Sequence, residues 1–273
     1  MMRGFMLVEA LISMALTVTL MMAVMGLVTS GHRIARLQPE AADQQQRIRI
    51  GVQALAQDIA HAGTGLDTGS RAGPLPQFFG ALTPSSDGGI TVWYVSSREA
   101  QATLASSAGP GSSVLSLAPN ALCPVAQSAC AFAPATTGIL FDASGCRDVV
   151  RIDATYTAAL QLHAPLTGCT YAPGASIAQG EVRTYRVDTA ARQLIRRDEA
   201  TGIDVPVLEG VADMRIEYFD EAVSTTPLPV DPILAPRSIR RIRVTLRFAA
   251  GPRDTVPDLV VSFDVTPANL SLT

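Results

Sequence analysis

A run of predominantly apolar residues from Phe5 to Val28 constrains this 273-residue chain more than any other feature. It contains a single charged residue, Glu9. At about 1.5 Å of rise per residue, a helix of roughly 24 residues is long enough to cross a hydrocarbon core of about 30 Å. A signal peptide usually has a shorter apolar region that ends in a small-x-small cleavage site. The run has no such ending and therefore predicts a membrane helix.

Glu9 is the residue that lipid tolerates least in this helix. Insertion scales assign an ionisable group at a helix centre a cost of roughly 2.5 to 3.5 kcal/mol, so such a residue marks a functional position by default. Glu9 is also the fifth residue of any chain that begins at Phe5. A plain uncleaved signal anchor explains the length of the run, but neither the Gly4–Phe5 junction nor an isolated acid at this offset.

The length of sequence on each side of the apolar run sets the expected orientation. Arg3 precedes the apolar run, and all chemically varied sequence follows it. Basic residues flank both ends, so the excess of positive charge expected on the cytoplasmic side supports an orientation only weakly. We expect a cytoplasmic amino terminus and place the remainder of the chain outside the cytoplasm.

Four cysteines fit that compartment, because disulfides persist where the environment is oxidising. No two of them have the C-x2-C spacing of a zinc site. Four cysteines allow three pairings, and free buried thiols are an alternative. We favour Cys123–Cys130 together with Cys146–Cys169, because each pair closes a loop that holds its own Pro or Gly residues.

An amphipathic helix is predicted to continue the apolar run. The stripe that would pack on the rest of the protein repeats at steps of 4, 3, 4 and 3 and consists of Ile48, Val52, Leu55, Ile59 and Ala62. The residues expected to face solvent are Arg47, Arg49, Gln53, Gln57 and Asp58. Pro39 predicts a restart or a kink, and Gly63 a stop. We therefore expect one long helix from Phe5 to about His61.

The rest of the chain is predicted to be rich in β-strands. Strand-like runs are Ile90–Val95, Val114–Leu117, Val149–Ala154, Val182–Val187, Gln193–Arg196, Met214–Phe219, Ile239–Phe248 and Leu259–Val265. In the run that ends at Phe248, apolar residues alternate with Arg241, Arg243, Thr245 and Arg247, which predicts a half-buried antiparallel sheet. The expected fold class is α+β, with a long helix packed on an antiparallel sheet.

Composition offers no support for catalysis or for nucleic-acid binding. The chain has 21 basic and 24 acidic residues, and every basic residue is Arg. No block of like charge suggests an electrostatic partner. The His-Glu-x-x-His, Gly-x-Ser-x-Gly and Gly-x-Gly-x-x-Gly motifs are missing from the sequence. We expect no catalytic residues, no cofactor and no metal.

Three stretches resemble a known family. Gly4-Phe-Met-Leu-Val-Glu9 resembles the prepilin signal of type IV pilins and type II secretion pseudopilins. The helix exit Leu55-Ala-Gln-Asp58-Ile-Ala-His-Ala62-Gly63, and the segment from Glu181 to about 220, are similar to the PilW family of minor pilins. The J-type pseudopilins share much of this plan. Residues 66–180 carry no part of the resemblance.

The resemblance implies a processed membrane protein with a pilin-like fold. A prepilin peptidase would cut between Gly4 and Phe5 and methylate the new amine of Phe5. Glu9 would then neutralise the terminal amine of a neighbouring subunit during assembly. Residues 1–4 would be a leader, residues 5–62 the helix with 5–28 in the inner membrane, and residues 63–273 a periplasmic β-rich head.

The implied function is that of a low-copy pilin which primes assembly or forms the pilus tip. Its partners would be the prepilin peptidase, other minor pilins, the major pilin, the inner-membrane assembly platform and a tip adhesin. The final location would be a pilus or pseudopilus filament. The alternatives are a J-type pseudopilin of a type II secretion system and, from another class, a signal-anchored periplasmic enzyme or ligand-binding domain.

Overall fold

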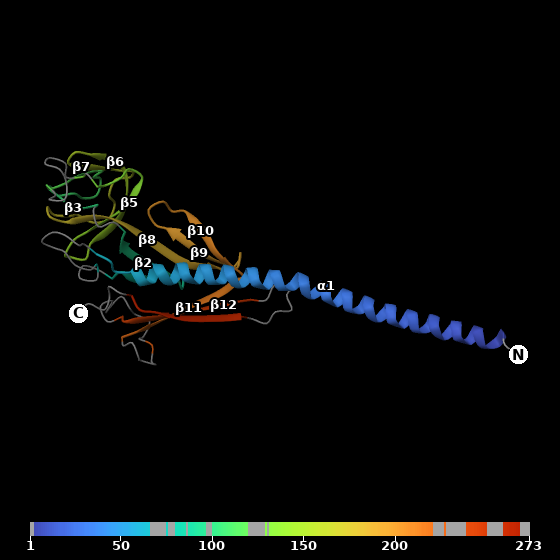
Figure 1. The fold of residues 1–273 in the computed structure, drawn as a ribbon. Coiled ribbons are helices and arrows are strands. Elements are labelled where there is room, and N and C mark those ends of the chain that lie inside the picture. The colour runs from blue at the N-terminus through green and yellow to red at the C-terminus, as the bar shows by residue number, and fades with distance from the viewer. Residues whose placement is uncertain are drawn as a thin grey trace. The chain divides into compact units, whose positions relative to one another are not determined.

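The structure is a computed structural model, and it describes residues 3–65, 75, 80–85, 87–96, 100–119, 129, 131–220, 227, 239–249 and 259–267. Contacts divide the chain into two compact units, residues 1–52 and residues 53–273, and each is described by itself. Helix α1 (Arg3–His61) makes up most of the first unit, and its last turns belong to the second. The strands that follow pair in antiparallel fashion, so the chain has the predicted α+β class (Figure 1).

Helix α1 is one long helix, as the sequence predicts. Its segment Val8–Gly31 has 24 residues, none of them buried, and is long and apolar enough to cross a membrane as a single span or a signal anchor. Helix α1 continues through Pro39, so the predicted restart at that residue is wrong, and the alternative of a kink stays a prediction. Proline removes one backbone donor, and this helix continues without that hydrogen bond.

The last turns of α1 bury one face within the second unit. Leu55, Ile59 and Ala62 are fully buried there, whereas Gln53 is exposed. The prediction that Asp58 faces solvent is wrong, because this residue is only 5% exposed. Positions 55, 58, 59 and 62 share one face of a helix, so the carboxylate lies inside the apolar stripe. Its burial requires a partner from elsewhere in the chain.

On the predicted packing face of the first unit, Ile48 is buried and Val52 is half-buried. The helix is followed by Gly63, whose φ of 81° is in the left-handed region that ends many helices. The amide of Gly63 donates to the carbonyl of Trp93 at 3.0 Å. This hydrogen bond joins the end of the helix to the first long strand of the sheet.

Thirteen strands lie in the described part of the second unit. They are β1 (Leu82–Pro84), β2 (Ile90–Val95), β3 (Gln101–Thr103), β4 (Val114–Ser116), β5 (Thr136–Phe141), β6 (Arg147–Tyr156), β7 (Ala159–Leu162), β8 (Ser176–Asp188), β9 (Gln193–Asp198), β10 (Asp204–Glu209), β11 (Val211–Phe219), β12 (Arg241–Phe248) and β13 (Leu259–Val265). The first ten form one sheet, in which β8 pairs with β2, β3, β5 and β9, and the last three form a second sheet.

The larger sheet closes on itself into a small barrel. Strand β8 pairs with β3 on one side and with β5 on the other, and the order continues through β6 and β7 to β4. Backbone hydrogen bonds from Ala105 to Ser116 (2.9 Å) and from Ala118 to Thr103 (2.8 Å) join β4 back to β3. Six strands therefore surround one apolar core, which includes Leu115, Leu140, Ile152 and other residues that are mostly small or aliphatic.

Strand β8 belongs to both the barrel and the open part of the sheet. Its first residues pair with β3 and β5, whereas residues from Gly180 onward pair with β2 and β9. A Cβ atom at Gly180 would lie 2.5 Å from Ile139 Cδ1 and 2.7 Å from the carbonyl oxygen of Tyr94. Two neighbouring strands thus approach too closely for a side chain at the point where β8 leaves the barrel.

A disulfide and a buried polar group hold one end of the barrel. Cys146 and Cys169 are bonded, as the sequence analysis favours, whereas Cys123 and Cys130 lie outside the described residues. Beside the disulfide, the hydroxyl of fully buried Tyr171 donates to Asp148 at 2.9 Å. Burial, followed by the hydrogen bond to Asp148, raises the pKa of Tyr171, so the phenol remains neutral.

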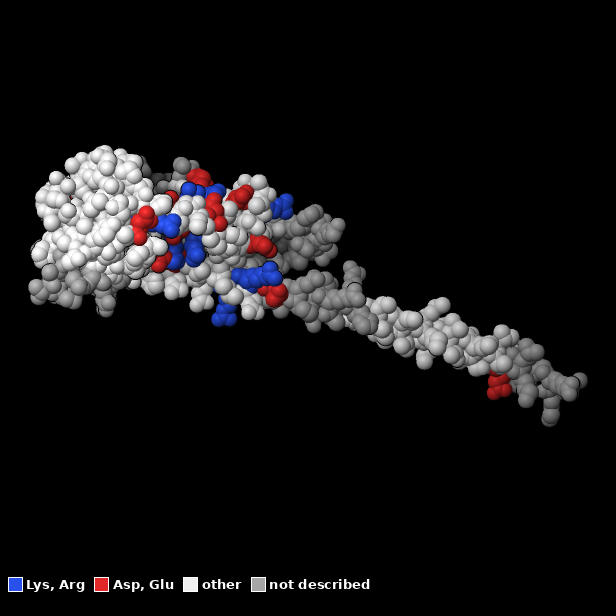
Figure 2. Space-filling model, turned by 90° about the horizontal axis from the view of Figure 1, so that it is seen from above, with Lys and Arg blue, Asp and Glu red and all other residues white. Residues whose placement is uncertain are grey.

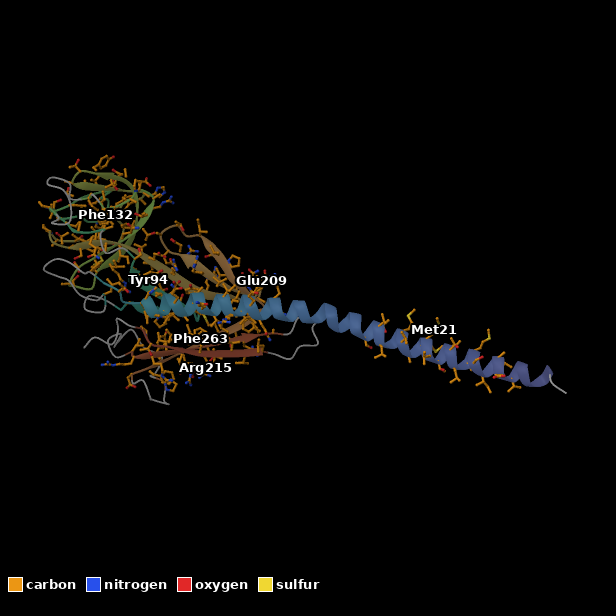
Figure 3. All side chains as sticks on the ribbon, in the orientation of Figure 1. Met21, Tyr94, Phe132, Glu209, Arg215 and Phe263 are labelled. Carbon is orange, nitrogen blue, oxygen red and sulfur yellow. A yellow bond between two sulfur atoms is a disulfide. The ribbon has the colours of Figure 1, made fainter. Side chains whose placement is uncertain are left out.

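The three-stranded sheet β11–β12–β13 has one buried and one polar face. In β12, Ile242, Val244, Leu246 and Phe248 are buried and alternate with the predicted Arg and Thr positions. The register pairs Phe263 with Val244, and Arg215 with Thr245. Phe263 and Arg215, both labelled in Figure 3, therefore belong to opposite faces of the sheet. Strand β11 also contacts β8 and β9, which joins the two sheets.

Charge is distributed unevenly over the second unit. From Ala100 to Gly180 the charged residues are only Asp142, Arg147, Asp148, Arg151 and Asp153. On the face seen in Figure 2, the barrel end is white, and acidic and basic side chains gather over the region of β8, β9 and β10. The charged side chains of the second unit are therefore concentrated outside the barrel.

We predict that replacing both Cys146 and Cys169 by Ala lowers the free energy of unfolding by about 3 kcal/mol. The bond closes a segment with a sequence separation of 23 residues, and a cross-link of that length restricts the unfolded chain by roughly this amount. Thermal unfolding of the full chain in detergent micelles measures the change. An unaltered midpoint would show that the cross-link does not stabilise the barrel.

A pH dependence is predicted for Asp264, which accepts hydrogen bonds from Arg243 (2.8 Å) and Arg241 (2.6 Å). The hydrogen bond from Arg243 is the main reason that the pKa of Asp264 is lowered. A lowered pKa in the folded state stabilises the fold above the unfolded value, near 3.9, and this contribution is lost as the pH falls through the folded value.

Asp264→Asn should therefore destabilise the protein at pH 7, by less than about 1 kcal/mol because the ion pairs are partly exposed. The difference from the unchanged protein should become smaller as the pH is lowered from 7 to 3, as measured by urea unfolding at both pH values. A difference that persists undiminished at low pH would contradict the assignment.

Candidate functional sites on the helix

Glu9 lies on the exposed surface of the apolar segment. Its carboxylate makes no hydrogen bond or ion pair within the part of the chain that the structure describes. Hydroxyl groups of the same segment are satisfied within the helix: those of Ser13, Thr17, Thr19 and Thr29 each donate to a carbonyl three or four residues earlier, at 2.7 to 3.0 Å. Glu9 is therefore the group of this segment that needs an external partner in lipid.

Gly4 and Phe5, the predicted cleavage and methylation positions, lie within the first turns of α1. Their side chains are outside the described residues, and so is any contact they make. Cleavage between them, methylation of Phe5 and the assembly role of Glu9 remain predictions from the sequence.

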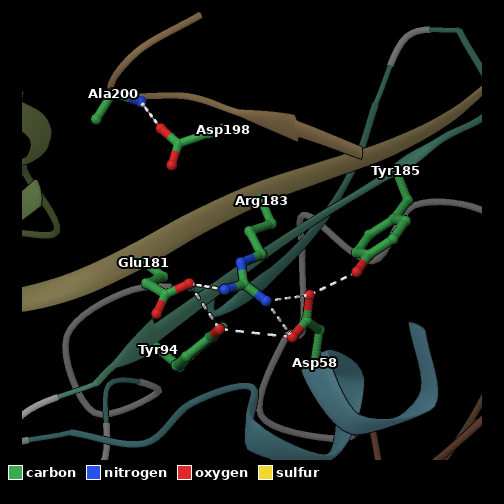
Figure 4. Close-up of polar contacts among 7 residues, drawn as sticks. All are labelled: Asp58, Tyr94, Glu181, Arg183, Tyr185, Asp198 and Ala200. Carbon is green, nitrogen blue, oxygen red and sulfur yellow. Dashed lines mark hydrogen bonds and ion pairs between the residues drawn. The ribbon is translucent and has the colours of Figure 1, made fainter. Parts of the chain in front are cut away.

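A second polar site lies at the opposite end of α1, within the second unit. The carboxylate of Asp58 receives hydrogen bonds from Arg183 Nη1 on β8, at 2.6 Å to Oδ1 and 2.8 Å to Oδ2 (Figure 4). The hydroxyl of Tyr185, two residues along the same strand, donates to Asp58 Oδ2 at 2.5 Å. One buried carboxylate is thus held by a cation and a phenol from a strand more than a hundred residues away in sequence.

Glu181 and Tyr94 complete this network. Arg183 Nη2 donates to Glu181 Oε2, and the hydroxyl of Tyr94 on β2 donates to the same oxygen at 3.1 Å. The guanidinium of Arg183 also lies over the Tyr94 ring, 5.6 Å from its centroid. The members from β8 occupy alternate positions, 181, 183 and 185, so they project from one face of the sheet toward the helix end.

The charges of this site stabilise one another. Burial alone would lower the pKa of Arg183, but the hydrogen bond and charge of Asp58 outweigh it and raise that pKa. Burial and then the charge of Asp58 raise the pKa values of Tyr94 and Tyr185. The arginine is therefore charged and the tyrosines are neutral donors at physiological pH, which is the arrangement that a buried carboxylate requires.

A cavity of about 500 Å³ lies beside this network. The helix contributes Ala54, Gln57, Asp58 and His61 to its wall, and the sheet contributes Tyr94, Gln101, Glu181, Arg183 and Arg196. Thr64, Gly65, Val95 and Ser96 complete the lining. The volume is within the range of small-molecule sites, and no part of this cavity is predicted from the sequence.

Two signals in the sequence point to the network. Asp58 is the charged residue within an apolar stripe of helical period, and Glu181, Arg183 and Tyr185 alternate along one strand. Sequence reasoning places Asp58 on the solvent face because a charge is usually exposed. Only the pairing of β8 with β2 brings Tyr94 into the same site.

Comparison of the chain with models of known families, with curated proteins and with solved structures finds no match. The resemblance to minor pilins therefore rests on the sequence patterns given above.

We predict that Asp58→Ala lowers the free energy of unfolding by about 3 kcal/mol. This is the lower end of the range for breaking a buried ion pair, because Arg183 retains 23% side-chain exposure and can be partly solvated. Urea unfolding of the full chain in detergent micelles measures the loss.

The matched control is Asp204→Ala, which removes a carboxylate of the same unit that pairs with Arg186 on the surface. It should cost less than about 1 kcal/mol. If the two variants lose equal stability, Asp58 is not the anchoring residue that its burial indicates.

Proposed function

We propose that this chain is a minor type IV pilin, a low-copy subunit that primes pilus assembly or forms part of the pilus tip. The observation that carries the proposal is the carboxylate of Glu9, which is exposed and has no partner among the residues that the structure describes, in an otherwise apolar segment. The other end of the same helix is fixed inside a β-sheet domain. A carboxylate at this position is costly in lipid and becomes favourable only next to a cation at the same depth.

The amine that cleavage of the leader, residues 1–4, would expose could supply such a cation. Cleavage between Gly4 and Phe5 would create an amino terminus four residues before Glu9, and the methylated amine remains positively charged. In a bundle of parallel helices, the amine of one subunit would then meet Glu9 of its neighbour. Small residues along the segment allow helices to approach closely; they are Ala10, Ser13, Ala15, Ala23 and Gly26.

The helix end fits a subunit that must carry its head into a filament. Leu55 and Ile59 are fully buried in the second unit, and Asp58 is held by Arg183 and Tyr185. A force applied along the helix is therefore resisted by apolar burial and by charged hydrogen bonds, which are stronger than neutral ones. The proposed partners are the prepilin peptidase, other minor pilins, the major pilin, the assembly platform and a tip adhesin.

A J-type pseudopilin would use the same helix chemistry in a secretion system, and it is the nearest alternative. A signal-anchored ligand-binding domain is the alternative from another class, and the cavity beside Asp58 is the observation that favours it. Cleavage of the first four residues separates the plain anchor from both pilin-type proteins.

We expect mass spectrometry of the mature protein, isolated from its natural host, to find an N-methylated Phe5 at the amino terminus. Glu9→Gln should leave this processing intact and reduce incorporation into filaments about tenfold or more, since each 1.4 kcal/mol of lost pairing is roughly tenfold in an equilibrium. Immunoblots of sheared filaments measure incorporation.

Glu9→Asp is the control, because it retains the charge and should assemble better than the amide. Gly4→Ala should block cleavage. A mature protein that still begins at Met1 or Met2, in a host that processes other prepilins, would overturn the proposal, and full incorporation of Glu9→Gln would remove the assembly role of the acid.

A further inference from the structure

Strand β13 is a regular, mostly apolar edge of the three-stranded sheet. Among the described strands it pairs only with β12, and that pairing has no bulge. It contains neither Pro nor Gly, and Asp264 is its one charged residue. Leu259 and Val260 are 41% and 56% exposed. An edge of this kind offers unpaired backbone groups to a strand of another molecule.

The other sheet edges in the described part of the chain are protected against such pairing. Strand β10 contains Pro206, at which its register shifts, and carries Asp204 and Glu209. Strand β1 has three residues and ends at Pro84. Strand β11 shifts register near its start and contacts β8 and β9. Proline, bulges, charge and short strands are the usual protections of an edge, and β13 has neither proline nor bulge.

The polar face of this sheet has one arginine that lacks an acidic neighbour. Asp264 accepts hydrogen bonds from Arg241 at 2.6 Å and from Arg243 at 2.8 Å. Arg247 lies opposite Val260 in the register of β12 and β13. This exposed arginine makes no hydrogen bond or ion pair within the residues that the structure describes. Its charge is available to another molecule.

Strand β13 is complementary to itself in antiparallel pairing. When Ser262 of two copies lie opposite each other, Val260 of each copy lies opposite Asp264 of the other. Val261 then lies opposite Phe263, a pair of a β-branched and an aromatic residue that stabilises sheets. Apolar residues therefore meet on one face of the joined sheet, and the acid of each copy lies beside an apolar residue on the other face.

This register supplies the missing partner of Arg247. On the polar face, Arg247, Val260 and Asp264 of the second copy would lie in one row across three neighbouring strands. The outer two Cα atoms would be about 10 Å apart. An arginine stem lies readily along apolar surface while its head reaches a charge, so Arg247 can extend over Val260. Arg241 already reaches Asp264 from a position diagonal to it.

We propose that β13 forms a two-fold symmetric dimer with a second copy of this chain, by antiparallel pairing centred on Ser262. Arg247 of each copy binds Asp264 of the other, so the two-fold axis repeats the ion pair. The interface is small, which makes the dimer weak and reversible. It goes beyond the proposed role in the pilus and does not depend on it, since processing and filament incorporation are measured separately.

Opposite charges at position 260 test both the dimer and its register, by sedimentation of the full chain in detergent micelles. Val260→Asp should weaken dimerisation at least fivefold, because the new carboxylate faces Asp264 of the other copy. Val260→Lys should strengthen it at least twofold, because the ammonium group faces the same carboxylate. Within one chain the two effects are reversed, since position 260 lies beside Arg247. A weakened fold therefore does not explain the expected loss.

A cysteine at the proposed two-fold axis provides a second measurement. Ser262→Cys should form a disulfide-linked dimer in oxidised glutathione, because the two residues face each other. Thr245→Cys is the matched control: Thr245 lies beside Ser262 on the same face, and the two copies of this residue would be about 14 Å apart. The unchanged chain controls for the native cysteines.

The proposal is overturned if the full chain does not dimerise, or if Val260→Asp and Val260→Lys change dimerisation in the same direction. A dimer that neither variant alters would be held by the membrane helix and would also overturn it. Equal cross-linking of Thr245→Cys and Ser262→Cys would exclude the register centred on Ser262.

Discussion

The ion pair between Asp58 and Arg183 is the interaction on which the second unit depends. A carboxylate with 5% exposure is unfavourable unless cations and hydrogen-bond donors replace its water. Arg183 and Tyr185 supply those donors, and both belong to β8, the strand shared by the barrel and the open sheet. The end of the helix is thereby fixed to the one strand that organises the rest of the fold.

The barrel explains why the middle of the sequence is hard to interpret. Strand β3 has three residues, too few for alternation to be recognised, whereas β4 lies within the predicted run Val114–Leu117. The two strands close the ring through backbone hydrogen bonds. The ring also requires β3 to pair with β8, which is far from it in sequence, and no local pattern predicts that pairing. The need for glycine at position 180 is explained only by the three-dimensional structure, because β8 passes there between Ile139 and Tyr94 with no room for a side chain.

Sequence reasoning succeeds where a pattern is long and local. It gives the helix to His61, and β2 and β13 with the bounds that the structure has. The apolar stripe at helical spacing identifies Leu55 and Ile59, and the alternation in β12 identifies the Arg face. It fails at Asp58, because a charge inside an apolar stripe indicates burial only when its partner is known. That partner is 125 residues away.

The amino-terminal half of the helix and the second unit differ in where their polar groups find partners. In the amino-terminal half of the helix, the carboxylate of Glu9 has no partner among the described residues, and the proposed function assigns it a partner on another molecule. The second unit has a satisfied buried ion pair with a cavity beside it, and its barrel surface carries little charge. An assembly function in the helix and a recognition function in the head are therefore compatible in one chain.

The proposal that this chain initiates or caps a type IV pilus is best tested by deleting its gene in the natural host and counting surface pili by electron microscopy. We expect a severe loss of pili, restored by a plasmid copy, with secretion of exoproteins unaffected. Normal pilus numbers would contradict it, and normal pili together with failed secretion would assign the chain to a pseudopilus instead.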